Sequence, residues 1–335
     1  MKIAIVNSDT FGKYFPQHIE SLSKFGEVER LRVDRNITGE VLAEKLKGFN
    51  IVIASITPRY DSAFFALNRD VALITRHGIG VDNINLEAAT EAGVIIARTP
   101  GFMERESVAE HAVALLLQVA RKINPAAESV KESGWKDRAR FQGIEIRNKN
   151  AGIIGFGNIG SRVAEILKNG FGCRILVYDP NVSPIDIKRL GEPVVLDYLL
   201  KECDIILLLC SLNEKNYHML GKREFSIMKK GAILVNISRG ELIDEDALIE
   251  SLEKGNMGGV GLDVVEGEPV GKNHPLLKFE EVVIVPHIAA YTKESLEKMG
   301  SKIVEDVKKI AGKEIPEEVV NPEVLKKTNL RIKAL

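Results

Sequence analysis

Residues 153–160 read IIGFGNIG, a G-x-G-x-x-G segment near the middle of a chain of 335 residues. The apolar residues 151–154 predict a strand that enters the first glycine, and residues 161–168 (SRVAEILK) predict a helix that leaves the third. A second predicted strand, residues 174–178 (RILVY), ends at Asp179, which lies 19 positions beyond Gly160 (179 − 160). This order of elements predicts a βαβ unit that binds a dinucleotide.

Each position of the segment has a physical role in such a site. Gly155 permits the tight turn, Gly157 lets the backbone approach a pyrophosphate, and Gly160 lets the helix pack on the strand. The helix N-terminus offers free N–H groups and a partial positive charge to the pyrophosphate. Asp179 can accept hydrogen bonds from ribose hydroxyls and would repel the 2′-phosphate of NADP, and no Arg or Lys occurs in residues 180–184. We therefore expect NAD as the cofactor, held by Gly155, Phe156, Gly157, Asn158, Ile159, Gly160 and Asp179.

Length and composition limit the other readings. A chain of 335 residues is long enough for two domains, and its net charge of −1 gives no reason to expect nucleic acid or an anionic membrane as a partner. No apolar run approaches the ~20 residues of a membrane helix, and the start MKIAIVNSDT reads as a strand rather than a signal peptide. Three cysteines without C-x-x-C spacing predict buried thiols in a reducing cytoplasm, and we expect no metal site.

Short apolar strands alternate with amphipathic helices, which predicts parallel α/β sheets. Because the dinucleotide segment is central, residues before about 99 should form a separate unit, and the later strands fit a six-stranded doubly wound sheet. The helix predicted at 108–120 is apolar on most sides, which fits either a core helix or a subunit interface. The expected strands are residues 2–6, 27–31, 51–56, 72–76 and 94–97, then 151–154, 174–178, 194–195, 205–210, 232–237, 260–263 and 282–285.

Three polar residues follow late strands, where open parallel sheets bind ligands. Arg239 could clamp a carboxylate, Glu268 could orient a histidine, and His287 could act as a general acid and base. Each also has a plain structural reading when taken alone: a surface arginine, a solvated acid and a satisfied core histidine.

Taken together, several segments resemble one family over about residues 50–292. The D-specific 2-hydroxyacid dehydrogenases include glyoxylate/hydroxypyruvate reductases, D-3-phosphoglycerate dehydrogenases, D-lactate dehydrogenases and formate dehydrogenase. The matching segments are 77–84 (HGIGVDNI), 108–111 (VAEH), 155–160 with Asp179, 236–240 (NISRG), 261–263 (GLD), 268–269 (EP) and 286–288 (PHI).

The resemblance implies a fold and a role for each site residue. It implies a Rossmann NAD-binding domain, residues 99–287, inserted in a flavodoxin-like substrate domain made of residues 1–98 and 288–335. Arg239 would bind the carboxylate and carbonyl of a 2-oxo acid, and His287 would give the carbonyl oxygen a proton as hydride arrives from NADH. Glu268 would hydrogen-bond His287 and favour imidazolium. Asp263 would lie near the nicotinamide carboxamide, and the backbone of Gly78 and Ile79 would cradle the substrate carboxylate.

The chain departs from the family in places that bear on specificity. Residues 211–213 (SLN) replace the usual Pro-Leu-Thr, and the loop at 101–107 (GFMERES) is one residue longer and carries three charged residues whose role the sequence leaves open. Arg59 and His77 could meet an anionic or hydroxylated substrate tail, or Arg59 could be solvated while His77 braces its loop. Tyr291 could line the pocket or serve packing alone.

The expected function is therefore NAD(H)-dependent reduction of a small 2-oxo acid to the D-2-hydroxy acid, and the reverse oxidation, with glyoxylate or hydroxypyruvate as substrate. The alternative within the class is a D-3-phosphoglycerate dehydrogenase, since a phosphate would suit Arg59 or Arg76. An alternative of another class is an NAD(H)-sensing, corepressor-like binding protein. The resemblance also implies a cytoplasmic homodimer with the helix at 108–120 at its centre.

Overall fold

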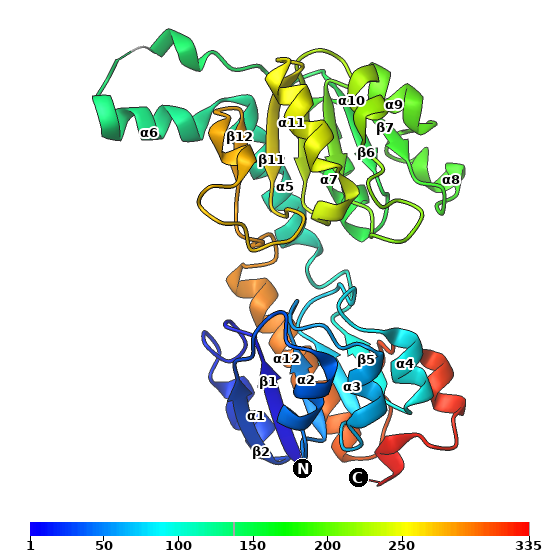
Figure 1. Cartoon of the computed structure of the whole chain (residues 1–335). Coiled ribbons are helices and arrows are strands. Elements are labelled where there is room, and N and C mark those ends of the chain that lie inside the picture. Colours follow the sequence, from blue (N-terminus) through cyan, green and yellow to red (C-terminus); the bar gives the residue numbers. More distant parts are fainter. Residues whose placement is uncertain (137, 335) are drawn as a thin grey trace. The chain divides into compact units, whose positions relative to one another are not determined.

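The computed structural model describes residues 1–136 and 138–334 and divides into two compact units (Figure 1). The first unit is Met1–Glu104 with Ala290–Leu335, and the second is Arg105–Ala289. Within the described residues each unit holds one sheet whose strands are all parallel, five in the first unit and seven in the second. Two doubly wound parallel sheets confirm the predicted fold class.

The first unit has the strand order β2-β1-β3-β4-β5. Both faces of the sheet are buried along β1, β3, β4 and β5: alternate residues of these strands enter two different core clusters, which explains their mostly apolar sequences, whereas the edge strand β2 is largely exposed. The strands are β1 (Lys2–Val6), β2 (Glu27–Leu31), β3 (Ile51–Ala54), β4 (Leu73–Arg76) and β5 (Ile95–Arg98). The helices are α1 (Gln17–Ser23), α2 (Gly39–Lys45), α3 (Ser62–Leu67), α4 (Leu86–Glu91) and α12 (Lys293–Ala311), followed by 3-10 turns at Pro322–Lys326 and Arg331–Ala334.

The C-terminal part of the chain returns to this first sheet. Helix α12 packs against α1 and β4, and its Ile303 and Val307 are fully buried with the strand residues of one face. Beyond the helix, the buried side chain of Asn321 accepts a hydrogen bond from the amide of Ile96 (2.9 Å) and donates to the carbonyl of Val94 (3.0 Å). Both bonds fasten the tail to the β5 edge of the sheet.

The second unit has the strand order β12-β11-β10-β9-β6-β7-β8. The chain winds one way from β6 to β7 and β8 and the other way from β9 to β12, so the order reverses beside β6, where doubly wound sheets bind ligands. The strands are β6 (Asn150–Ile154), β7 (Arg174–Tyr178), β8 (Glu192–Pro193), β9 (Ile205–Leu208), β10 (Ala232–Asn236), β11 (Met257–Leu262) and β12 (Val282–Ile284). The helices are α5 (Arg105–Ala120), α6 (Ile123–Ser133), α7 (Asn158–Phe171), α8 (Pro184–Ile187), α9 (Leu196–Glu202), α10 (Lys222–Ile227) and α11 (Glu245–Glu253), with 3-10 turns at Arg138–Phe141, Gly240–Leu242 and Pro275–Lys278.

Three expectations about this sheet are wrong in detail. It has seven strands among the described residues rather than six, and β8 lies at Glu192–Pro193 rather than at 194–195. Strand β11 begins at Met257, three residues before the expected start. The prediction missed this start because glycines at 258 and 259 interrupt the apolar sequence. A Cβ atom at Gly259 would lie 2.1 Å from Val119 of α5, so the bare strand backbone is what lets this helix approach the sheet.

The large apolar side chains of helix α5 are mostly buried within its own unit, which supports the reading of this helix as a core helix. Val113, Leu115, Leu116 and Val119 are all buried, and Leu117 is half-buried. The packing partners are α7, β10 and β11 of the same unit. Several exposed apolar side chains of this unit lie on and just after α6. This helix leads away from its sheet (Figure 1), and Ile123, Val130 and Trp135 are 51%, 47% and 78% exposed.

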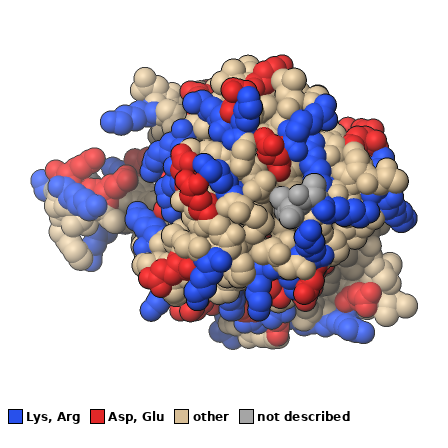
Figure 2. All heavy atoms as spheres, turned by 90° about the horizontal axis from the view of Figure 1, so that it is seen from below, with Lys and Arg blue, Asp and Glu red and all other residues tan. Residues whose placement is uncertain are grey.

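Charges of both signs are interspersed on the face drawn in Figure 2. None of the helices in residues 1–136 and 138–334 is both long and apolar enough to cross a membrane. The same residues hold no group of three or more His, Cys, Asp or Glu side chains arranged to bind a metal ion.

Candidate active site

The glycine segment makes a tight strand–turn–helix connection between β6 and α7. Gly155 has a φ of +95°, and a Cβ atom there would lie 2.5 Å from the amide of Cys210. A Cβ atom at Gly160 would lie 2.0 Å from the carbonyl oxygen of Gly155, so helix and turn are in direct backbone contact. A Cβ atom at Gly157 would meet nothing within 4 Å. The open space at Gly157, at the start of α7, fits the close approach of a pyrophosphate.

Asp179, directly after β7, is tied to this turn by its carboxylate. Its Oδ2 accepts a hydrogen bond from the amide of Phe156 (2.7 Å), and its Oδ1 accepts one from the amide of Asn181 (2.8 Å). A carboxylate oxygen can accept more than one hydrogen bond, so both oxygens keep capacity for ribose hydroxyls. The residues present therefore fit NAD.

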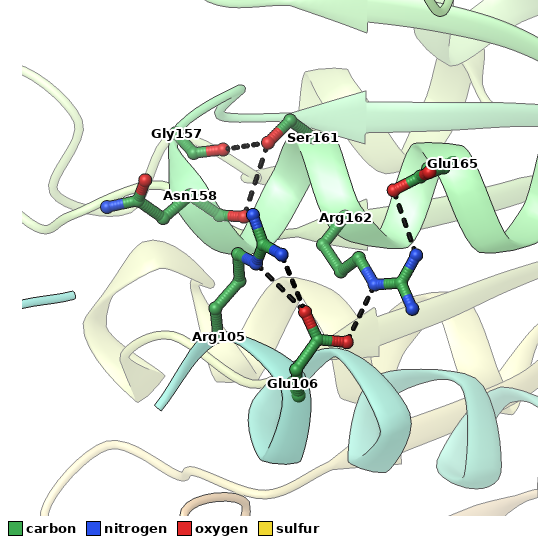
Figure 3. Close-up of polar contacts among 7 residues, drawn as sticks. All are labelled: Arg105, Glu106, Gly157, Asn158, Ser161, Arg162 and Glu165. Carbon is green, nitrogen blue, oxygen red and sulfur yellow. Dashed lines mark hydrogen bonds and ion pairs between the residues drawn. The ribbon is translucent and has the colours of Figure 1, made fainter. Parts of the chain in front are cut away.

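Two charged residues of the 101–107 loop, Arg105 and Glu106, lie beside helix α7 (Figure 3). Glu106, in the first turn of α5, accepts hydrogen bonds from Nε of Arg162 on α7 (2.8 Å) and from Nη2 of Arg105 (2.8 Å). Arg162 also donates to Glu165 (2.8 Å). The hydrogen bonds from Arg162 and Arg105 lower the pKa of Glu106. Glu106 thus links the start of α5 to the helix that begins in the glycine turn, while Glu104 of the same loop is buried.

His287 and Glu268 form a close pair after β12 and β11. Nδ1 of His287 lies 2.5 Å from Oε1 of Glu268, and the two side chains are 28% and 29% exposed. None of the hydrogen bonds among the described residues engages Nε2 of His287, so this nitrogen can exchange a proton with a ligand. His287 has a φ of +53°, an uncommon value for a residue other than glycine.

Asp263 fixes the backbone on which His287 stands. Its carbonyl accepts the amide of His287 (2.9 Å), and its buried carboxylate accepts the amides of Ile288 (2.7 Å) and Ala289 (3.1 Å). Nε2 of His111 on α5 lies 3.4 Å from the same carboxylate. The sequence predicts a contact of Asp263 with the nicotinamide and gives His111 only within a matching segment. It does not predict the support that Asp263 gives to the backbone at His287. Three consecutive amides on one residue explain how the strained position of His287 is held.

Arg239 follows β10, the strand next to β11, after which Glu268 lies. The fully buried Asn236 donates from Nδ2 to the carbonyl of Arg239 (2.7 Å) and accepts from the amide of Ser238 (3.0 Å). The guanidinium of Arg239 donates from Nη1 to the carbonyl of Ser238 (2.6 Å). The guanidinium is half-buried, and its planar fork can pair with a carboxylate.

In the first unit, the expected substrate residues are mostly engaged with their own loop. The amide of Gly78 donates to the carbonyl of Arg76 (2.9 Å) and lies 3.3 Å from Oγ1 of Thr99. Arg76 is buried and donates to the carbonyl of His77. Within residues 1–136 and 138–334, no hydrogen bond uses the amide of Ile79, so this amide is the one available to a ligand.

The contacts of His77 indicate that it supports its own loop, as in the second of the two roles considered for it, and does not face a substrate tail. Its Nδ1 lies 3.2 Å from Oγ of Ser8, and its ring meets Phe11 edge to face at 5.4 Å. Burial, and then the charges of Arg76, His18 and Arg30, lower the pKa of His77 to about 3. Arg59 is exposed, as is Tyr291 at 53%.

Comparison with known proteins gives three kinds of match. The family model described as the NAD binding domain of the D-isomer specific 2-hydroxyacid dehydrogenases matches residues 113–289. A D-3-phosphoglycerate dehydrogenase of Methanocaldococcus jannaschii is 38% identical over 308 residues, 91% of this chain and 58% of that protein. A glyoxylate reductase of Thermococcus litoralis is 36% identical over 314 residues, 92% of this chain and 94% of that protein.

Among solved structures, that of D-lactate dehydrogenase from Aquifex aeolicus complexed with NAD and lactic acid has a TM-score of 0.83 at 28% identity. The match covers 95% of this chain and 99% of that one. Its high coverage extends the similarity beyond the second unit to both parallel sheets. The chain nevertheless spans only 58% of the length of the phosphoglycerate dehydrogenase relative.

Proposed function

The chain belongs to the D-isomer specific 2-hydroxyacid dehydrogenases, an oxidoreductase family with NAD as cofactor, and we propose that it reduces a small 2-oxo acid such as glyoxylate or hydroxypyruvate. The product is the corresponding 2-hydroxy acid, of D configuration where that carbon is chiral, and the reverse oxidation uses the same groups. The observation that carries the proposal is the pair of His287 and Glu268, 2.5 Å apart at the carboxyl edge of the NAD-binding sheet, with Arg239 after the neighbouring strand β10.

Bound NADH supplies the hydride, and the side chains of this chain handle the substrate and the proton. Arg239 pairs with the substrate carboxylate and its neighbouring carbonyl oxygen. His287 donates the proton on Nε2 to that carbonyl oxygen as negative charge develops there, and accepts it back in the oxidation. Glu268 hydrogen-bonds Nδ1, so that the ring stays oriented with Nε2 available for the substrate. Asp263 holds the backbone of His287, and its predicted contact with the nicotinamide carboxamide remains part of the proposal.

We assign the cofactor to the second unit and the substrate-specific contacts to the first. Gly155, Phe156, Gly157, Asn158, Ile159, Gly160 and Asp179 would hold NAD, with domain limits near 98/99 and 287/288 as the family resemblance implies. Gly78 and Ile79 remain the proposed substrate cradle in the first unit. Among the described residues the amide of Ile79 makes no hydrogen bond, which supports its role in binding the substrate. The amide of Gly78 already has partners within its own loop.

The choice of substrate rests on which arginines are available. A phosphorylated substrate needs a cation for its phosphate, and the burial of Arg76 beneath its own loop argues against one candidate. The exposed Arg59 keeps 3-phosphoglycerate as the second candidate. The glyoxylate reductase of Thermococcus litoralis matches this chain along 94% of its length, which supports the smaller substrate.

The test is oxidation of NADH with glyoxylate, hydroxypyruvate, pyruvate and 3-phosphohydroxypyruvate in parallel. We expect the highest kcat/KM with glyoxylate or hydroxypyruvate, and Arg59→Ala should not lower it more than about twofold. Highest turnover with 3-phosphohydroxypyruvate, lost in Arg59→Ala, would establish the second candidate instead. Binding of NADH without turnover of any of the four acids would favour the corepressor-like alternative.

We also propose a cytoplasmic homodimer. The dimer is supported by the apolar side chains that Ile123, Val130 and Trp135 expose on and just after α6. Three cysteines without a disulfide, two of them buried, fit a reducing compartment. Light scattering of wild type and Trp135→Ser should give a dimer and a weakened dimer, and a monomeric wild type at micromolar concentration would refute the assembly.

A further inference from the structure

A cluster of Tyr217, His218 and Glu266 lies beside the proposed catalytic group and has no role in the mechanism above. The hydroxyl of Tyr217 donates to Oε1 of Glu266 at 2.9 Å, and Nε2 of His218 lies 2.7 Å from Oε2. The two rings stack with centroids 4.0 Å apart and planes 18° apart. Adjacent residues rarely place their side chains on the same side, and here the φ of His218, +50°, makes it possible. One carboxylate therefore receives one donor on each oxygen.

The cluster bridges two loops across the strand that carries Arg239. Tyr217 and His218 belong to the loop after β9, and Glu266 belongs to the loop after β11. In the sheet order, β10 lies between these strands, and Arg239 follows the last residue of β10 by three positions. The link therefore passes over the carboxyl end of β10.

The segment after Arg239 is held by backbone contacts from both bridged loops. On one side, the amide of His218 donates to the carbonyl of Glu241 (2.8 Å), and that of Leu220 donates to the carbonyl of Leu242 (3.1 Å). On the other side, a Cβ atom at Gly240 would lie 2.1 Å from the amide nitrogen of Glu266. Residues 240–242 thus lie between the two loops, and a shift of either loop displaces the residue next to Arg239.

The loop of Glu266 is anchored in turn. Its amide donates to Oε1 of Glu245 at the start of α11 (3.1 Å), and the other oxygen of Glu245 lies 3.3 Å from Nε2 of His274. The hydrogen bond to Glu266 raises the pKa of Tyr217, so the phenol remains a donor at neutral pH. These contacts make the Glu266 side a fixed support and the loop after β9 the part that it holds.

We propose that Tyr217, His218 and Glu266 are positioning residues that hold Arg239 in place to receive the substrate carboxylate. The inference rests on the proposed role of Arg239. An arginine fork binds a carboxylate through two parallel hydrogen bonds, so its affinity depends on sub-ångström placement. A cluster that served folding alone would change stability without separating substrate binding from cofactor binding.

The experiment measures KM for glyoxylate, the Kd of NADH, and the Kd of oxamate, an unreactive 2-oxo acid analogue, for the enzyme–NADH complex. Glu266→Ala should raise the KM and the oxamate Kd about tenfold, and Tyr217→Phe about threefold, with the NADH Kd changed less than about twofold. Tyr217→Phe removes one exposed hydroxyl and keeps the test valid if Glu266→Ala folds poorly. Glu253→Gln, which breaks the exposed pair with Lys278 in the same unit, is the matched control and should change none of the three values.

A double-mutant cycle separates this inference from the role of Arg239. Arg239→Lys keeps the charge but loses the fork and should weaken oxamate binding, and in that background Glu266→Ala should add less than about twofold. Unchanged oxamate affinity in Arg239→Lys would refute the proposed function of Arg239 itself. Weak oxamate binding in Arg239→Lys, combined with wild-type binding in Glu266→Ala and Tyr217→Phe, would refute only the positioning role. Equal losses of NADH and oxamate affinity in Glu266→Ala would refute it too.

Discussion

At the carboxyl ends of both parallel sheets an arginine and a histidine end or follow strands: Arg76 and His77 in the first unit, Arg239 and His287 in the second. In the first unit Arg76 is buried, and Nε2 of His77 is buried with no hydrogen-bond partner among the residues described. In the second unit His287 has only Nδ1 engaged. The same residue types at the same end of the same kind of sheet thus serve a loop in one unit and, in our proposal, a substrate in the other. Burial, rather than residue type, separates the two.

The largest expected effect contrasts the two histidines directly. His287→Ala removes the proposed proton donor and should lower kcat with glyoxylate roughly 100-fold or more, with little change in the Kd of NADH. His77→Gln, its counterpart in the first unit, should leave kcat within about threefold. Steady-state kinetics and calorimetric titration of NADH give both quantities. Similar losses of kcat in the two variants would abolish the distinction.

Cofactor choice belongs to the second unit alone. Asp179→Ala should lower the preference for NADH over NADPH, measured as the ratio of kcat/KM values, by about tenfold, because the 2′-phosphate no longer meets a carboxylate. Asp179→Asn is the matched variant: it keeps an oxygen for the amide of Phe156 and removes only the charge. A wild-type enzyme that used NADPH better than NADH would contradict this reading.

The buried state of His77 predicts a pH dependence of stability in the first unit. Its pKa is about 3 in the folded chain and about 6.5 when unfolded, so between these values the unfolded chain binds a proton that the folded chain does not. The free energy of unfolding is therefore unaffected above pH ~6.5 and should fall by about 1.4 kcal/mol at pH 5.5. Denaturant unfolding followed by circular dichroism at pH 7.5 and 5.5 checks this. The difference between the two pH values should shrink in His77→Gln, and an equal pH dependence in both proteins would mean that His77 titrates normally.

The smallest expected effect concerns the link from α5 to α7 in the second unit. Glu106→Gln removes the charge that holds Arg162 and should raise the Kd of NADH about threefold, because the start of α7 loses its anchor beside the pyrophosphate site. Glu165→Gln removes the partner of Arg162 within α7 and should leave the Kd within error. Equal increases of the NADH Kd in the two variants would contradict a special role for the link between Glu106 and Arg162.

Local patterns predicted the part of the site that local sequence builds. The glycine segment, its flanking elements and Asp179 lie within 30 residues of one another, and turn chemistry with period-based patterns suffices for them. Arg239, Glu268 and His287 were found because each follows a predicted strand. Their mutual placement required the sheet order and came first from a family resemblance.

What the sequence could not reveal depends on long-range packing. The predicted strand β11 was too short because Gly258 lies against the backbone of Gly231 and Gly259 lies against Val119 of α5, about 140 residues earlier, and no pattern within the strand records these contacts. Tyr217 and Glu266 are 49 positions apart, and the burial of Arg76 follows from the fold of its loop around it. The residue type alone does not show whether an arginine is exposed, like Arg59, or buried, like Arg76.

Trp135 is the only tryptophan of the chain, and it is 78% exposed on the segment 121–145. In a single, unassociated chain the intrinsic emission therefore comes from an indole in water. Melting of the core should leave the emission maximum of such a chain almost unchanged, whereas covering of Trp135 by a second subunit should shift the maximum to shorter wavelength. The chain thus carries an optical probe of its own association.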